Sequence, residues 1–95
     1  MSDLKHPALG ERFVRETLGR LIDYDAKNNT DYMSVLKAFF ENDCSILHTA
    51  QAVYCHKNTL NYKMNKVKEI LGYDIMNNEN RTRIMVALYF IKMRA

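Results

Sequence analysis

The chain has 95 residues, of which 47% are apolar and 26% charged, so its length allows one domain with a modest hydrophobic core. No apolar run approaches the roughly 18 residues that a membrane span needs, and the polar amino terminus lacks the apolar stretch of a secretory signal. Two cysteines, Cys44 and Cys55, are too few for a disulfide scaffold. Composition therefore argues against a membrane protein and a disulfide-rich secreted domain, and it predicts a cytoplasmic protein with no membrane partner.

The positive charge is concentrated in the middle of the chain. Residues 1–44 carry six Lys or Arg against eight Asp or Glu, whereas residues 45–71 carry four lysines and one glutamate. The whole chain has a net charge of +3. A basic segment inside a nearly neutral domain predicts an anionic partner, although a solvated lysine face is the more common origin of such a bias.

Apolar residues recur at helical spacing through the first half of the chain. A first helix carries them on one face between residues 13 and 22 and ends in the polar run DAKNN. Thr30 is predicted to cap a second helix that ends near Asn42 and Asp43. The inner faces of these two helices are predicted to comprise Phe13, Val14, Leu18, Leu21, Ile22, Met33, Leu36, Phe39 and Phe40.

Three further helices are predicted in the second half, and no stretch shows strand alternation or an internal repeat. Ser45 is expected to cap a short third helix, and a fourth spans about residues 57–71 and stops at Gly72, which suits the left-handed C′ position. Asn77 or Asn78 caps a fifth helix. The apolar sides of the third and fifth helices are predicted to comprise Ile46, Leu47, Ala50, Val53, Ile84, Met85, Leu88 and Ile91. The prediction is an all-α domain of about five helices.

The fourth helix has two contrasting sides. Only three residues separate it from the third helix, so the two must meet at a steep angle, as they do in a helix-turn-helix unit. At about 100° per residue, its apolar face comprises Leu60, Met64, Val67 and Leu71, its outward strip Asn58, Asn61, Tyr62 and Asn65, and its flanks Lys57, Lys63, Lys66 and Lys68. Such a helix suits a DNA major groove, because amides bind base edges while ammonium groups bind phosphates. Any surface helix is polar opposite its core, so a merely solvated face stays an alternative.

Four short motifs stand in a recognisable order, with LIDYD at 21–25, TAQAV at 49–53, HKNTLNYKM at 56–64 and ILGYDI at 70–75. Across residues 17–91 the chain resembles the C-terminal helix-turn-helix domain of PucR-type transcriptional regulators, which are related to the CdaR sugar-diacid regulators. The turn and fourth helix also resemble the DNA-binding end of Fis. The resemblance implies a DNA-binding domain at 17–95, preceded at 1–16 by a helical extension or linker.

The resemblance implies a bacterial regulator whose output domain binds double-stranded DNA, with the fourth helix in the major groove and an N-terminal sensory region elsewhere in the protein. The DNA-facing residues that the resemblance implies are Lys57, Thr59, Asn61, Tyr62 and Lys63, with Ser45 and Thr49 near the DNA backbone. The turn and the outward side and flank of the fourth helix add His56, Asn58, Asn65 and Lys66 to the predicted DNA-binding residues. The family usually has arginine at positions 61 and 63 and a polar capping residue at 47, where this chain has Asn61, Lys63 and Leu47. The preferred DNA sequence therefore cannot be transferred from relatives.

A protein-interaction or dimerisation module without DNA binding of its own is the alternative function. The fifth helix is apolar around much of its girth, through Ile84, Met85, Val86, Leu88, Tyr89, Phe90 and Ile91. A single domain of this size is not expected to bury all of these side chains, which points to a helix–helix contact in a homodimer.

Two other sets of residues could indicate a metal or an acid–base site. A zinc set would comprise Cys44, His48, Cys55 and His56, but this spacing matches no usual zinc pattern, and Cys55 is expected to be a small buried residue. Asp23 and Asp25 resemble a catalytic carboxylate pair, but a helix cap or a local salt bridge is the expected role. No nucleophile–base motif and no phosphate-binding glycine loop is present. We therefore predict no enzymatic activity, no metal and no cofactor.

Overall fold

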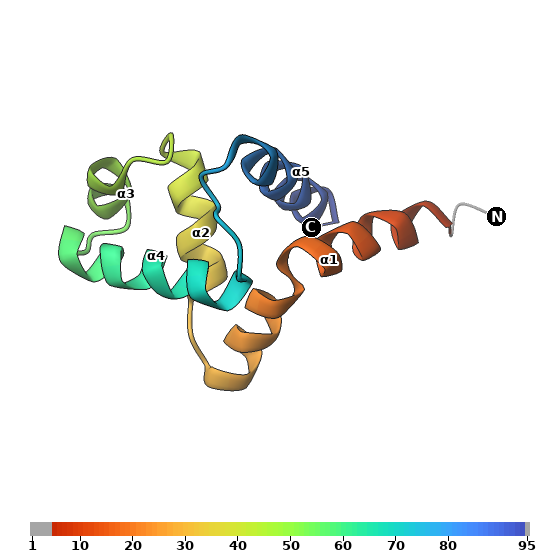
Figure 1. Cartoon of the computed structure of the whole chain (residues 1–95), viewed down its shortest axis with the longest axis horizontal. Helices are drawn as coiled ribbons and strands as arrows, with labels where there is room; N and C mark the ends of the chain where they lie inside the picture. The colour runs from red at the N-terminus through yellow and green to blue at the C-terminus, as the bar shows by residue number, and fades with distance from the viewer. Residues whose placement is uncertain (1–4, 95) are drawn as a thin grey trace.

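The computed structural model describes residues 5–94, with side chains from residue 10 onward. Its helices are α1 (Lys5–Asn28), α2 (Tyr32–Glu41), α3 (Ile46–Ala52), α4 (Lys57–Leu71) and α5 (Asn78–Arg94), and this range contains no strand (Figure 1). The all-α class and the five predicted helices are confirmed. The expected boundary between residues 16 and 17 falls within α1, which is continuous there, and residues 1–4 of the expected extension lie outside the described residues.

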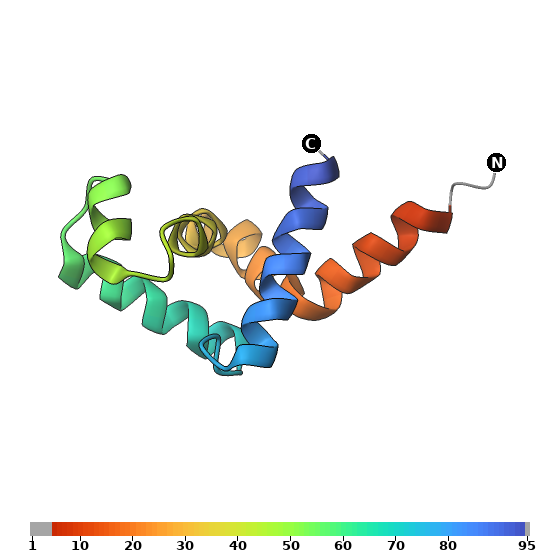
Figure 2. The ribbon, with the colours of Figure 1, turned by 90° about the horizontal axis from the view of Figure 1, so that it is seen from above.

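All five helices contribute to one core. α1 packs against α5, α4 and α2, while α4 also packs against α2 and α3. Both ribbon views show the start of α1 projecting away from the other helices, and the longest dimension of the molecule is 48 Å (Figures 1 and 2). The largest fully buried side chains are Leu18, Leu21, Leu36, Leu60, Val67, Ile75 and Ile84. The core therefore holds α4 by its apolar face and leaves the opposite side of α4 free.

The start of α2 is capped by a carboxylate from α1. Asp25 accepts hydrogen bonds from the backbone N–H groups of Tyr32 (3.0 Å) and Met33 (2.8 Å), and the hydroxyl of Thr30 donates to the same carboxylate. Asp31 occupies the N-cap position but makes no side-chain cap hydrogen bond. The prediction that Thr30 caps this helix was wrong, because a negative charge satisfies the free N–H groups of a helix start better than a neutral hydroxyl.

The other helix ends follow the sequence signals. Ser45 caps α3 by accepting a hydrogen bond from the backbone N–H of His48 (3.1 Å), and Gly72 ends α4 with a left-handed φ of 79°. The side chain of Asn77 accepts from the backbone N–H of Glu79 at 3.0 Å at the start of α5. These three predicted helix ends are confirmed. Ser45 marks the start and Gly72 the end of the helix-turn-helix segment formed by α3 and α4.

Tyr73 fastens the loop after α4 to α1. Its hydroxyl donates a hydrogen bond to the backbone carbonyl of Thr17 at 2.8 Å. Burial raises the pKa of the Tyr73 phenol above that of a free tyrosine, so the neutral hydroxyl persists as a donor. This contribution to stability is complete below the ordinary tyrosine pKa and is lost as the pH rises through the raised pKa. The connection therefore holds the end of α4 against α1 at neutral pH.

Three residues predicted to lie in the core are instead exposed. Leu47 and Met85 each have 55% of their surface exposed, and Val53 has 37%. α3 has only seven residues and buries Thr49 and Ala50, which leaves Leu47 on its outer side. Val53, the C-cap residue of α3, only partly covers its side chain by lining a pocket with Val35 and Leu60. Met85 is exposed because α5 packs mainly against α1 and the residues it buries are Ile84 and Ala87, not Met85. Helical periodicity identifies an apolar side chain but not the neighbour that would cover it.

Candidate nucleic-acid interface

A tight turn sets α3 across the start of α4 (Figure 2). Tyr54 adopts a left-handed backbone conformation with a φ of 56°, and the backbone N–H of Cys55 donates to the carbonyl of Ala50 at 3.0 Å. His56 caps α4, since its Nδ1 accepts from the backbone N–H of Asn58 at 3.0 Å. In this tautomer its Nε2–H remains available as a donor. The expected helix-turn-helix geometry is present.

The two sides of α4 separate as the helical wheel predicts. Its apolar face is buried, with exposed fractions of at most 4% for Leu60, Met64, Val67 and Leu71. The predicted binding residues that are exposed here are His56, Lys57, Asn58, Thr59, Asn61, Tyr62 and Asn65. The largest of these side chains, Tyr62, has 61% of its surface exposed. A continuous strip of amides, hydroxyls and one ammonium group therefore faces away from the domain.

The two predicted binding residues around α3 have different positions. Ser45 is half-buried, and its hydroxyl oxygen accepts the cap hydrogen bond. Thr49 is fully buried, and its hydroxyl donates to the carbonyl of Ser45 at 2.6 Å. Thr49 therefore holds α3 from the inside, and its side chain is not part of the exposed surface.

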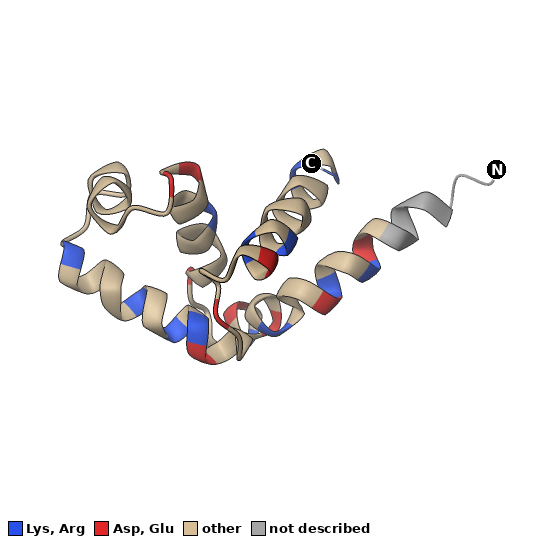
Figure 3. Ribbon diagram, turned by 45° about the horizontal axis from the view of Figure 1, so that its top comes forward, with Lys and Arg blue, Asp and Glu red and all other residues tan. Residues whose placement is uncertain are grey.

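Two of the predicted lysines are held by carboxylates of the domain. Lys63 forms an ion pair with Asp31, with a shortest distance of 3.1 Å between Nζ and Oδ2, and Lys66 forms one with Glu69 at 3.2 Å. Each lysine side chain is only 30% exposed. The hydrogen bond to Glu69 raises the pKa of the Lys66 ammonium. Figure 3 shows that basic residues recur along α4. Lys63 and Lys66 face the domain, since Lys63 is paired with Asp31 at the start of α2 and Lys66 lies over the ring of Tyr24 on α1.

Sequence reasoning missed two residues beside this surface. Tyr54 is 95% exposed in the turn, directly before the exposed strip. The sequence feature that could have predicted this exposure is an aromatic residue within a three-residue connection, which is too short to bury it. Asp31 was not connected with Lys63, because the two are 32 positions apart and no local pattern joins them.

The structure supports neither the candidate zinc set nor the candidate carboxylate pair as a site. Cys44 and Cys55 are free thiols, half-buried against the core, and the described part of the chain contains no group of three side chains placed to hold a metal ion. Asp23 forms an ion pair with Arg15 at 2.8 Å, while Asp25 caps α2. The expected salt-bridge and capping roles of these aspartates are confirmed.

No helix between residues 5 and 94 combines the length and apolar character needed to cross a bilayer.

The turn between α3 and α4, together with a second helix that is buried on one side and polar and exposed on the other, is typical of helix-turn-helix DNA-binding domains. Residues 32–90 match the PucR C-terminal helix-turn-helix domain, and the chain belongs to this family of bacterial transcription-regulator domains, as its resemblance predicted. The family is one of DNA-binding regulators and not of enzymes.

Several full-length proteins share this domain. The chain is 37% identical over 71 residues to the Carbohydrate diacid regulator of Escherichia coli, covering 75% of this chain and 18% of that protein. It is 30% identical over 78 residues to the Purine catabolism regulatory protein of Bacillus subtilis, covering 82% and 14%. Uncharacterized protein YsfB of Bacillus subtilis is 28% identical over 85 residues, covering 90% and 22%. The chain thus spans about a fifth or less of these curated relatives. No solved structure matches it significantly.

Proposed function

We propose that this domain binds double-stranded DNA sequence-specifically, with α4 in the major groove, as the output domain of a transcriptional regulator. The main support for this proposal is that α4 presents an exposed polar strip on one side while its opposite face is buried in the core. A rigidly held helix can present amides to base edges without reorganising. The strip has the mixture of amides and cations that base and phosphate contacts require.

Each exposed residue has a role that follows from its chemistry. Asn61 lies near the middle of the strip, and its amide can bind adenine through both N6 and N7. Lys57 at the start of α4 and the Nε2–H of His56 are suited to phosphates, as is Ser45 at the start of α3. The remaining contacts are assigned to Asn58, Thr59, Tyr62, Asn65 and the flanking Lys63 and Lys66. Thr49 contributes by holding α3 in place.

The proposal is tested by gel-shift titration of the wild type and a triple variant, Lys57→Ala, Asn61→Ala and Tyr62→Ala, on a duplex selected from a random pool and on unselected DNA. Asn61→Ala alone is expected to cost about 1–3 kcal/mol on the selected duplex and little on unselected DNA. Lys57→Ala should weaken both and reduce the salt slope by about one. Lys27→Ala, which removes an exposed lysine from the last turn of α1, is the matched control and should change binding little.

The rival function, a protein-interaction module, gives the opposite result in the same titration. It predicts no salt-dependent DNA binding by the wild type. Equal DNA binding by the wild type and the triple variant would contradict the assignment of α4 as the recognition helix.

We also propose that two copies of the domain bind DNA together, within a longer regulator that carries an N-terminal sensory region. One recognition helix contacts few base pairs, and specificity usually needs two half-sites about one helical turn apart. The exposed apolar residues of α5 are Met85, Val86, Tyr89 and Met93, with 55%, 39%, 61% and 63% of their surfaces exposed. These side chains are the surface we propose for a second copy.

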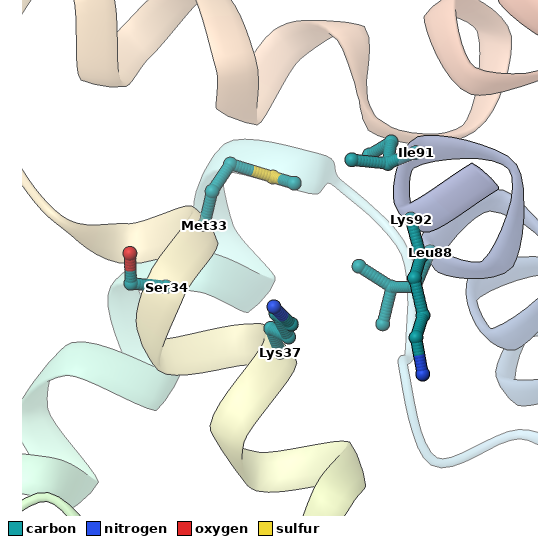
Figure 4. A pocket seen from close by; sticks show the side chains of 6 residues that line it. All are labelled: Met33, Ser34, Lys37, Leu88, Ile91 and Lys92. Atoms are coloured by element: carbon teal, nitrogen blue, oxygen red, sulfur yellow. The ribbon is translucent and has the colours of Figure 1, made fainter. Parts of the chain in front are cut away.

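A groove between α2 and α5 supports this assignment. Its first part, of about 260 Å³, is lined by Met33, Ser34, Lys37, Leu88, Ile91 and Lys92 (Figure 4). It continues along α5 past Phe40, Glu41, Met85 and Tyr89. Each copy therefore offers an apolar ridge and an apolar groove on one face, as a two-fold contact requires. Glu41 and Lys92 line the same groove, so each carboxylate can meet the ammonium group of the other copy.

Sedimentation at increasing concentration measures this pairing. The isolated domain is expected to be a monomer at low micromolar and to pair only at high concentration, because the sensory region supplies further contacts. Tyr89→Glu should abolish pairing, since it places a charge on the apolar ridge. Tyr54→Glu makes the same change in the turn and should leave pairing unaffected. A strict monomer with full affinity for one half-site, or a nanomolar dimer, would contradict this prediction.

A further inference from the structure

The ion pair between Asp31 and Lys63 joins the start of α2 to the candidate DNA-binding helix. Lys63 Nζ lies 3.1 Å from Oδ2 and 3.2 Å from Oδ1, so the ammonium is shared between both carboxylate oxygens. The Asp31 side chain is 58% exposed and that of Lys63 30% exposed. Water and a large anion can therefore both reach the pair.

Asp31 is free to make this contact because another residue, Asp25, caps the start of α2. An aspartate at an N-cap normally accepts from the backbone N–H of the second or third residue of its own helix, which are Met33 and Ser34 in α2. Here the N–H groups of Tyr32 and Met33 are already bound to Asp25. The carboxylate of Asp31 makes no cap hydrogen bond and turns to Lys63 instead.

Lys63 lies at the border between the buried and exposed sides of α4. It follows Tyr62 of the exposed strip directly and precedes the buried Met64. Asp31, Lys63 and Leu60 also line a small pocket between α2 and α4, so the stem of Lys63 is packed while its ammonium reaches the surface. A short movement of that ammonium would take it from the carboxylate to a DNA phosphate beside α4.

We propose that Asp31 is a positioning residue that holds Lys63 in the free protein and competes with DNA phosphate for it. This inference rests on the proposed function. When the domain binds DNA, the Lys63 ammonium leaves the Asp31 carboxylate for a phosphate. The attraction of Lys63 to DNA is therefore largely offset by the broken ion pair with Asp31. Asp31 therefore lowers affinity for all DNA alike and leaves the preference among sequences unchanged, because phosphates carry no sequence information.

Asp31→Asn is expected to raise affinity about two- to fivefold on selected and unselected DNA alike, the factor that an exposed ion pair typically contributes. The salt slope should become steeper by about one, because the phosphate contact of Lys63 then releases a cation from DNA while no Asp31 carboxylate is left to take one up. Asp23→Asn is the matched control, since it removes a carboxylate paired with Arg15 on α1. It should leave both quantities nearly unchanged. Thermal denaturation of each variant checks that the fold is intact.

The decisive comparison is Lys63→Met made in the Asp31→Asn background. The added substitution should reverse the gain in affinity and return the salt slope to the wild-type value. Lys27→Met in the same background controls for the general loss of a positive charge, since Lys27 is an exposed lysine in the last turn of α1. A parallel measurement needs no DNA: amine labelling of the free protein, read by mass spectrometry, should modify Lys63 faster in Asp31→Asn than in the wild type, with Lys68 unchanged.

The outcomes separate the two proposals. Unchanged labelling of Lys63 overturns this inference whatever the DNA results. DNA binding that depends on Asn61 but not on Lys63 in the Asp31→Asn background overturns this inference and leaves the proposed function standing. The absence of any DNA binding by the wild type overturns both.

Discussion

Leu60→Ala is expected to lower the free energy of unfolding by about 3 kcal/mol, within the range found for buried leucines. Leu60 is fully buried in the first turn of α4, and it lines the small pocket between α2 and α4 with Val35 and Val53. Removing its side chain deletes apolar contacts and enlarges a space that these neighbours do not fill. Urea denaturation followed by circular dichroism measures the change.

Leu47→Ala is the matched control, because it is the same substitution on the exposed side of α3. With 55% of its surface exposed, Leu47 should change stability by less than about 0.5 kcal/mol. If the two variants lost the same stability, α4 would not pack as the structure shows. Leu60→Ala should also weaken DNA binding on selected and unselected duplexes, because the recognition helix loses its fixed seat against α2 and α3.

Asp25→Ala is expected to cost about 2–3 kcal/mol of stability, because it removes a charged acceptor from two backbone N–H groups and one hydroxyl. The N–H groups of Tyr32 and Met33 would lose their partner at a partly buried helix start. Asp25→Asn keeps an acceptor oxygen without the charge and should fall between the wild type and alanine. Thermal and urea denaturation at neutral pH both report the difference.

Asp23→Ala tests whether this effect belongs to the cap rather than to any aspartate of α1. Its ion pair with Arg15 is exposed on both sides, at 57% and 70%, and should contribute less than about 1 kcal/mol. Similar losses for the two alanine variants would contradict the capping role of Asp25. A loss confined to Asp25 would show that the α1–α2 connection, which places Asp31 beside Lys63, depends on this one carboxylate.

Helix ends with local signals could be read from the sequence, because the groups that make them are neighbours in the chain. Ser45 and His48 are three positions apart, and the left-handed turn after α4 needs only Gly72. The cap of α2 could not be read in this way. Its acceptor, Asp25, lies in the preceding helix and reaches Met33, eight positions later, across the connection between the two helices.

The exposed strip of α4 was also predictable, since helical spacing alone places Asn58, Asn61 and Tyr62 opposite Leu60. Whether these residues contact DNA stays a proposal. The wheel placed lysines on both shoulders of the helix but could not distinguish an available ammonium from one already bound to a carboxylate. Lys57 is exposed, whereas Lys63 is paired with a residue from another helix.

The five helices, the tight α3–α4 turn and the two-sided character of α4 could all be predicted from the amino-acid sequence alone. All three follow from interactions between residues within a few positions of one another, which are the same in any fold that contains these helices. The burial of Thr49, the exposure of Met85 and the ion pair between Asp31 and Lys63 arise only when the helices pack together. Each of these depends on which helix packs against which, and a periodic pattern carries no information about the neighbour across the contact.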